Sequence, residues 1–158
     1  MKKALVLGAL ALALAPEAAH AANSVGLGVG AGVAVPHGQA LRTDAALNWG
    51  FHVDIPILDS FAISPSTYLY RVNGASATDV SVNFKFVIPL GRLDLYGGVT
   101  AGLTNIDRIE PHVGALAGVE LVLVSNLDLF VQASYRTMLQ EGDDTRDLMV
   151  FAGPVFRF

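Results

Sequence analysis

The sequence predicts an all-β protein: an eight-stranded antiparallel up-and-down transmembrane β-barrel that follows a cleaved signal peptide. The chain is 53% hydrophobic but only 15% charged, whereas a soluble domain usually carries about 25% charged residues. Its apolar residues alternate with small or polar ones, which is the period of a strand. After the first residues there is no uninterrupted apolar run of about 20 residues, the length of a spanning helix. The alternating stretches number eight, and single-chain bacterial barrels have an even number of strands.

The first 21 residues have the pattern of a secretory signal peptide. A basic pair, Lys2-Lys3, precedes a 12-residue apolar run, and Ala19-His20-Ala21 fits a small-x-small cleavage site. We expect cleavage after Ala21, so that residues 1–21 are the signal peptide and residues 22–158 form one barrel domain. The chain has no cysteine, which excludes a lipoprotein anchor and a disulfide framework.

The charge of the mature chain restricts its partners. Removing residues 1–21 leaves 8 basic and 13 acidic residues. A mildly acidic chain without a basic cluster argues against nucleic acid or an anionic surface as a partner.

The first two predicted strands cover 24–35 and 45–55. In the first, apolar residues alternate with four glycines, and a glycine-rich face suits a narrow closed interior. The Gly-x-Gly pattern is also found in dinucleotide-binding loops, but here no strand precedes it and no helix follows, as those motifs require. In the second strand, Trp49 and Phe51 share the apolar face, and His52 and Asp54 lie on the other.

The third predicted strand, about 60–72, is the least regular. Pro65 interrupts it, and proline in a strand marks an edge or a bulge. After Pro65, either Tyr68 and Tyr70 or their neighbours in the chain face outward, and the sequence leaves this facing open. The fourth and fifth strands, 80–88 and 93–103, alternate clearly on either side of the tight turn Pro89-Leu90-Gly91-Arg92.

The last three predicted strands cover 112–123, 127–136 and 148–158, and Ser125-Asn126 turns the chain between the first two of them. The chain stops on the aromatic Phe158. In a soluble protein an exposed apolar end strand invites aggregation, but pairing with the first strand would close the barrel and remove the edge.

The connections alternate in length. The turns at 56–59, 89–92 and 125–126 are short, whereas those at 36–44, 73–77, 104–111 and 140–145 are longer and more polar. Membrane barrels have this asymmetry, with short turns on one side and long loops on the other. It places both termini on the short-turn side.

We expect the apolar face to point outward. A soluble barrel such as a lipocalin has the opposite arrangement, but here the polar face carries too little charge for a soluble surface and is rich in Gly, Ser, Ala and Thr. Side chains fill the interior of an eight-stranded barrel, and buried charges must be paired. We therefore expect a lumen network of His52, Asp54, Lys85, Asp94, Glu120, Asp128, Arg136 and Arg157.

Two hairpins and the chain end carry a family resemblance. The stretches 86–99 and 118–136 resemble hairpins of the small outer-membrane β-barrel family, the OmpA-like and OmpX-like eight-stranded proteins. Phe156 and Phe158 are similar to the carboxy-terminal assembly signal of that family. The resemblance covers 22–158. It implies an integral protein of the Gram-negative outer membrane, in contact with its lipid, with both termini periplasmic and with assembly by the outer-membrane insertion machinery.

The sequence predicts no catalytic residue, cofactor or metal site. In the lipid A deacylase type of barrel, His and Ser stand two residues apart on one strand, but here Gly114 stands two residues after His112 and Asp54 two after His52. An Asp-rich loop at 143–144, with His37, has no spacing for a metal cage.

The predicted function is therefore non-enzymatic. We expect a structural or partner-docking role, including as a subunit of a multi-protein cell-envelope complex, because the outer loops are short. The alternatives are a narrow pore for small or apolar solutes and, less favoured, a lipid-modifying enzyme. The aromatic residues that could belong to interfacial girdles are Trp49, Tyr70, Tyr96 and Tyr135.

Overall fold

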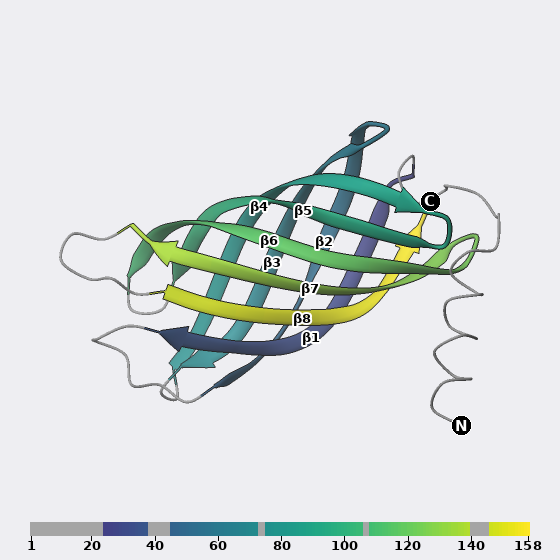
Figure 1. Ribbon diagram of the computed structural model, residues 1–158. Coiled ribbons are helices and arrows are strands. Elements are labelled where there is room, and N and C mark those ends of the chain that lie inside the picture. The colour runs from purple at the N-terminus through teal and green to yellow at the C-terminus, as the bar shows by residue number, and fades with distance from the viewer. Residues whose placement is uncertain (1–23, 38–44, 73–74, 106–107, 140–145) are drawn as a thin grey trace, which may run out of the picture.

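The computed structural model describes residues 24–37, 45–72, 75–105, 108–139 and 146–158. Over these ranges eight antiparallel strands form one closed barrel, in which each strand pairs with its neighbours in sequence and the last pairs with the first (Figure 1). The predicted signal peptide lies outside the described residues. The strands are β1 (Gly26–His37), β2 (Ala46–Leu58), β3 (Phe61–Val72), β4 (Ala75–Leu90), β5 (Leu93–Asn105), β6 (Ile109–Val124), β7 (Leu127–Met138) and β8 (Arg146–Arg157).

Within the described ranges, no helix has the length and apolarity that crossing a membrane would require.

Several strands extend further than their alternation predicts. β2 continues to Leu58, and β4 begins at Ala75, inside the loop predicted at 73–77. β5 ends at Asn105 and β6 begins at Ile109, so the loop predicted at 104–111 is also shorter. These boundaries were wrong because backbone pairing with the neighbouring strand, such as Ala75 opposite Val72, does not depend on alternating polarity.

The two chain ends close the barrel. β1 and β8 run antiparallel, with Gly26 opposite Arg157 at one end of the pair and His37 opposite Arg146 at the other. Beyond the strand itself, the Phe158 N–H donates a 2.9 Å hydrogen bond to the Val25 carbonyl. The terminal strand therefore has a partner on each side, and its open edge is removed as predicted.

Pro65 does not introduce a bulge where it stands. It is exposed on the outer face and lies opposite Val82 of β4. On its other side, the β2–β3 pairs His52–Ser66 and Ile55–Ile63 keep one register across it. Proline has no N–H to donate, so the ladder opens at this point without a shift, and the register shift between β2 and β3 falls between Pro56 and Leu58 instead.

The continuous register past Pro65 decides the facing of the following residues. Tyr68 and Tyr70 point into the barrel, with 2% and 8% of their surface exposed. Tyr96 also faces inward, whereas Trp49 and Tyr135 face outward. Two of the four candidate girdle residues are therefore lumen residues.

The apolar face points outward, as predicted. On β7, Val131 is 49% exposed, whereas its neighbour Gln132 is 3% exposed. The same alternation holds on β4, where Val82, Phe84 and Phe86 are exposed around the buried Asn83 and Lys85. The barrel therefore presents an apolar outer surface and a polar interior, the reverse of a soluble barrel.

Candidate functional site

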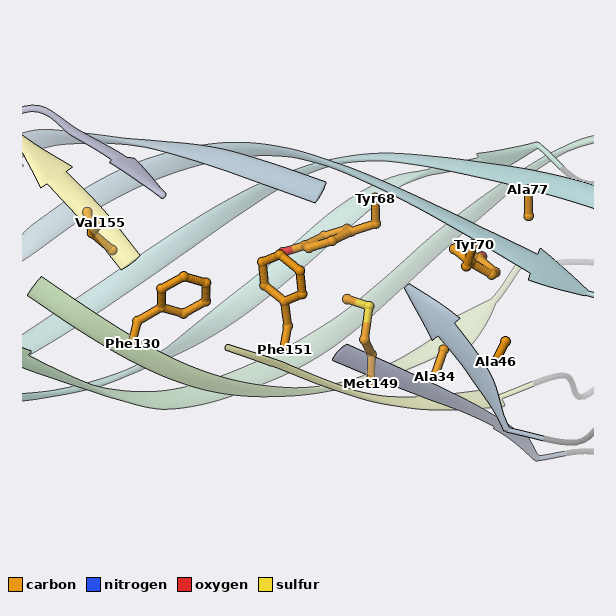
Figure 2. Close-up of a cluster of buried hydrophobic side chains, with 9 residues drawn as sticks. All are labelled: Ala34, Ala46, Tyr68, Tyr70, Ala77, Phe130, Met149, Phe151 and Val155. Carbon is orange, nitrogen blue, oxygen red and sulfur yellow. The ribbon is translucent and has the colours of Figure 1, made fainter. Parts of the chain in front are cut away.

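The lumen is filled by side chains in three layers. An ionic network lies near the short turns, an aromatic layer lies in the middle, and a second ionic network lies nearer the long loops. Figure 2 shows the apolar members spread along the interior, with Val155 towards one end and Ala34, Ala46 and Ala77 towards the other.

The aromatic layer separates the two networks. The Tyr68 and Phe151 rings meet edge-on with centroids 4.9 Å apart, and the Phe130 and Phe151 centroids are 5.4 Å apart. These three residues come from β3, β7 and β8 and point towards one another across the lumen (Figure 2). The His52 ring meets Phe130 edge-on at 4.8 Å. Each of these rings is at most 2% exposed, so the layer occupies the cross-section that a channel would need.

The first network is centred on Asp54. The Lys85 ammonium donates to Asp54 Oδ1 at 2.8 Å, and His52 Nε2 lies 3.3 Å from Asp54 Oδ2. Lys85 Nζ also lies 4.8 Å from the centroid of the Tyr96 ring, within the range of a cation–π contact. One buried carboxylate therefore holds two neighbouring basic side chains from β2 and β4.

Arg157 of β8 forms the second part of this network. Its Nε donates to Asp128 Oδ2 at 2.8 Å, and its Nη2 pairs with Glu120. The structure thus pairs Arg157 with two carboxylates of the predicted lumen network, those of Asp128 and Glu120. Asp94 lies in the same region and is 2% exposed, but its Oδ1 has no hydrogen-bond partner among the described residues.

Lumen glycines make room for these side chains. Gly28 lies opposite His52, and Gly118 lies opposite Tyr96. A Cβ added to Gly28 would overlap the His52 ring, and one added to Gly118 would overlap the Tyr96 ring. The glycine-rich face therefore reflects large side chains that lie flat across the neighbouring strand.

The second network was not predicted as a separate site. Arg136 is 1% exposed, and its Nη1 donates to Asp79 Oδ2 at 2.6 Å while its Nε donates to Asp147 Oδ1 at 2.9 Å. The Thr104 hydroxyl donates to Asp79 Oδ2 at 2.8 Å. Of the eight residues expected in one network, Arg136 thus lies apart from the others.

The carboxylates of Asp79 and Asp147 are absent from the predicted network, although the alternation of their strands indicates that they face the lumen. Continuing the alternation of β4 backward from Ser81 places Asp79 on the lumen face. Asp147 stands two residues before Met149, on the inward face of β8. Both positions lie just after the predicted loops 73–77 and 140–145, where charge is usually solvated, and the predicted network does not include them.

A Ser–His–Asp contact also lies in the second network. Ser81 and His112 both stand opposite Gly102 of β5, and without a side chain there the Ser81 Oγ and His112 Nε2 approach to 3.1 Å. His112 Nδ1 lies 3.5 Å from Asp79 Oδ2. The one-strand His–Ser spacing is absent at His112 and His52, as the sequence shows, and this Ser–His pair instead forms across two strands, β4 and β6.

The geometry of this contact favours a structural role. Ser81, His112 and Asp79 are each at most 2% exposed. The Ser81 hydroxyl donates to Asp79 Oδ1 at 2.5 Å, so its proton is directed to the carboxylate and not to the histidine that would act as base. A hydrolase needs the opposite arrangement and a path for its substrate.

The remaining predicted positions have other placements. Phe156 and Phe158 are 42% and 80% exposed, on the outside at the short-turn end. The side chain of His37 and the loop at 143–144 lie outside the described part. Among the described residues, no group of three or more His, Cys, Asp or Glu could hold a metal ion.

Comparisons with known proteins give the fold. No family model and no curated protein matches the sequence. The structure of neisserial surface protein A (NspA) matches with a TM-score of 0.73 at 13% identity, over 85% of this chain and 97% of that one. Ail, the attachment invasion locus protein of Yersinia pestis, matches at 0.60 with 12% identity, over 86% and 99%. OprG from Pseudomonas aeruginosa matches at 0.59 with 12% identity, over 87% and 96%.

Proposed function

We propose that this chain, which has the fold of the small eight-stranded outer-membrane β-barrels, is a non-enzymatic integral outer-membrane protein with a structural or partner-docking role in the cell envelope. The outward apolar face and the outer-membrane proteins among its fold neighbours support the location. In this proposal the short turns and both termini face the periplasm, and the insertion machinery of the outer membrane assembles the barrel.

The filled lumen is the observation that carries this proposal. The rings of Tyr68, Phe130 and Phe151 lie between two ionic networks, and all three are buried. Eight strands enclose an interior just wide enough for side chains. A barrel of this kind can span a membrane and anchor a partner there, but it offers no continuous aqueous path to a solute.

Electrical recording distinguishes this proposal from the narrow-pore alternative. Purified barrel, reconstituted in planar bilayers beside a porin of known conductance, should give no regular current steps. Reproducible steps of one size from the wild-type protein, absent from a mock preparation, would replace the proposal with a pore.

Crosslinking tests the docking role. A photoreactive residue at the exposed Asn126 of the β6–β7 turn samples the short-turn side, and one at the outward Val131 samples the surface of the barrel wall. A discrete crosslinked protein from either position in intact cells supports docking. If both positions crosslink only to lipid, the docking role is rejected and the structural role remains.

The Ser81–His112 contact is the one feature that raises a competing function, a serine hydrolase. A fluorophosphonate probe forms a covalent bond with an activated serine, so it tests this directly. We expect no labelling of the folded barrel, because Ser81 is buried and directs its proton to Asp79. Labelling that the Ser81→Ala variant loses would overturn the non-enzymatic assignment.

A further inference from the structure

A small cavity lies inside the barrel at its short-turn end. Its volume is about 30 Å³, which exceeds the roughly 10–15 Å³ that one water-sized molecule needs. Turn residues such as Asp59 contribute to its wall, so it lies near the mouth of the barrel. The polar side chains that line its inner part are Asp54, Lys85, Asp94, Tyr96, Glu120 and Arg157.

Two polar atoms of the cavity wall lack partners. Asp94 Oδ1 and the Tyr96 hydroxyl have no hydrogen-bond partner among the described residues. Their side chains stand two residues apart on β5, both line the cavity, and the residues are 2% and 6% exposed. Buried polar atoms are nearly always hydrogen-bonded, so each unpaired atom in a native structure requires an explanation. Both could accept a hydrogen bond from one ligand.

The charge around the cavity is unbalanced. Asp54, Asp94 and Glu120 in the cavity wall and Asp128 against Arg157 are acidic side chains with at most 5% exposure, and they accompany the basic side chains Lys85 and Arg157. The acidic side chains outnumber the basic ones even when His52 is counted.

The register makes this excess local. Asp94 lies directly opposite Glu120 on the lumen face of β5 and β6, and like charges in directly opposite positions destabilise a strand pair. Glu120 is paired with Arg157, and Asp54 with Lys85. The cavity wall next to Asp94 therefore favours a further cation.

The oxygen atoms that line the cavity suit an ammonium group and not a multivalent metal ion. Among the described residues, no three His, Cys, Asp or Glu side chains are placed so that they could hold a metal ion, whereas an ammonium group needs single acceptor atoms for its three N–H donors. The site already holds one such group: Lys85 Nζ lies between Asp54 and the face of the Tyr96 ring. Aromatic faces attract cations, and tyrosine does so with a hydroxyl acceptor at its edge.

We propose that this cavity binds a primary ammonium group, with Asp94 Oδ1 and the Tyr96 hydroxyl as its acceptors. The volume admits the ammonium head of a small alkylamine or of a lysine-like side chain, whereas a quaternary ammonium has no N–H to donate to these acceptors. This goes beyond the role proposed above and does not depend on it, because the cavity is a property of the folded barrel whatever the barrel docks.

Amide NMR of the full barrel refolded in detergent micelles tests the site. Methylammonium should give saturable shifts at Asp94, Tyr96 and Glu120, while tetramethylammonium at the same concentrations should not. A second arm uses N-acetyl-lysine methylamide. Binding of methylammonium indicates that a free amine suffices, and binding of the lysine derivative alone indicates a side chain as the ligand. Both outcomes support the proposal. If neither probe gives saturable shifts, the proposal is overturned.

Matched variants locate the acceptors. Asp94→Asn removes the negative charge that would face the ammonium group, and Tyr96→Phe removes a hydrogen bond to a charged donor, so each should weaken methylammonium binding at least about tenfold. Asp94→Asn also relieves the repulsion from Glu120, so this variant should still fold. Two controls lie outside the cavity: Ser134→Ala removes another buried hydroxyl without a described partner, and Glu110→Gln removes a carboxylate paired with Arg108. Equal affinity in all four variants would overturn the site.

Discussion

At the scale of single residues, the lumen charges are held by partners on other strands. Arg136 of β7 reaches Asp147 on the adjacent β8 and Asp79 on the more distant β4. Its side chain is 1% exposed, so water cannot replace either partner. A buried charge without its partner is far more costly than an intact pair.

Replacing Arg136 with methionine should therefore destabilise the barrel. Arg136→Met leaves Asp79 and Asp147 without their cation, and breaking a buried pair in this way costs about 3–5 kcal/mol. Urea unfolding of the barrel in micelles measures the difference in unfolding free energy.

A compensated variant serves as the control. Adding Asp79→Asn and Asp147→Asn to Arg136→Met removes the charges together, so part of the lost stability should return. If Arg136→Met alone unfolds at the wild-type urea concentration, the second network does not stabilise the fold.

At the scale of the strand, alternation determines which residues face outward. On β7 the outward residues Leu129, Val131 and Tyr135 are between 44% and 49% exposed, whereas the inward Phe130 and Gln132 are at most 3% exposed. The period of a strand is two, so one residue of slip would exchange the two faces completely.

Adjacent substitutions on β7 test the facing. Val131 lies in the middle of the strand on the outer face, where an arginine in lipid costs about 2–4 kcal/mol. Val131→Arg should therefore lower the yield of folded barrel in lipid vesicles. Gln132→Ala should not, because the hydrogen bond from Gln132 to the Tyr68 hydroxyl is long, at 3.5 Å. Equal yields from the two variants would contradict the assigned faces.

The last strand ends in the proposed assembly signal. Phe158 is 80% exposed, and its backbone N–H donates a hydrogen bond to the Val25 carbonyl. We expect deletion of Phe158 to lower the amount of barrel inserted into the outer membrane in cells, measured by membrane fractionation. Phe61→Ala removes another exposed aromatic side chain near a short turn and is the matched control. Wild-type insertion without Phe158 would show that the signal lies elsewhere.

At the scale of the whole molecule, closure satisfies the backbone. Every strand pairs on both sides, and β8 returns to β1. In lipid no water is present to bond with free N–H and C=O groups, so a sheet that spans a membrane has to close. The filled lumen adds side-chain contacts across the barrel, which join strands that are not neighbours.

A closed, filled barrel should resist unfolding by detergent. Samples in sodium dodecyl sulfate, loaded on a gel with and without boiling, should migrate at different positions, because the unboiled barrel stays compact. Identical migration of both samples, after refolding has been verified by circular dichroism, would contradict a stable closed barrel.

The sequence by itself determined the class of the fold, the number of strands and the outward face. These follow from a period of two, from strand-length stretches and from low charge, all of which are local properties of the chain. It also placed His52, Asp54 and Lys85 on the inner face. Strand ends such as Ala75 and Leu58 were less well predicted, because pairing with a neighbour extends a strand beyond its pattern.

The tertiary structure alone decided which lumen residues meet. The register around the barrel brings Ser81 and His112 together over Gly102, separates Arg136 from Arg157, and leaves Asp94 facing Glu120. Alternation gives a residue its face but not its height along the barrel. Height depends on the relative shift of strands far apart in the chain, and this shift is fixed when the eight strands close.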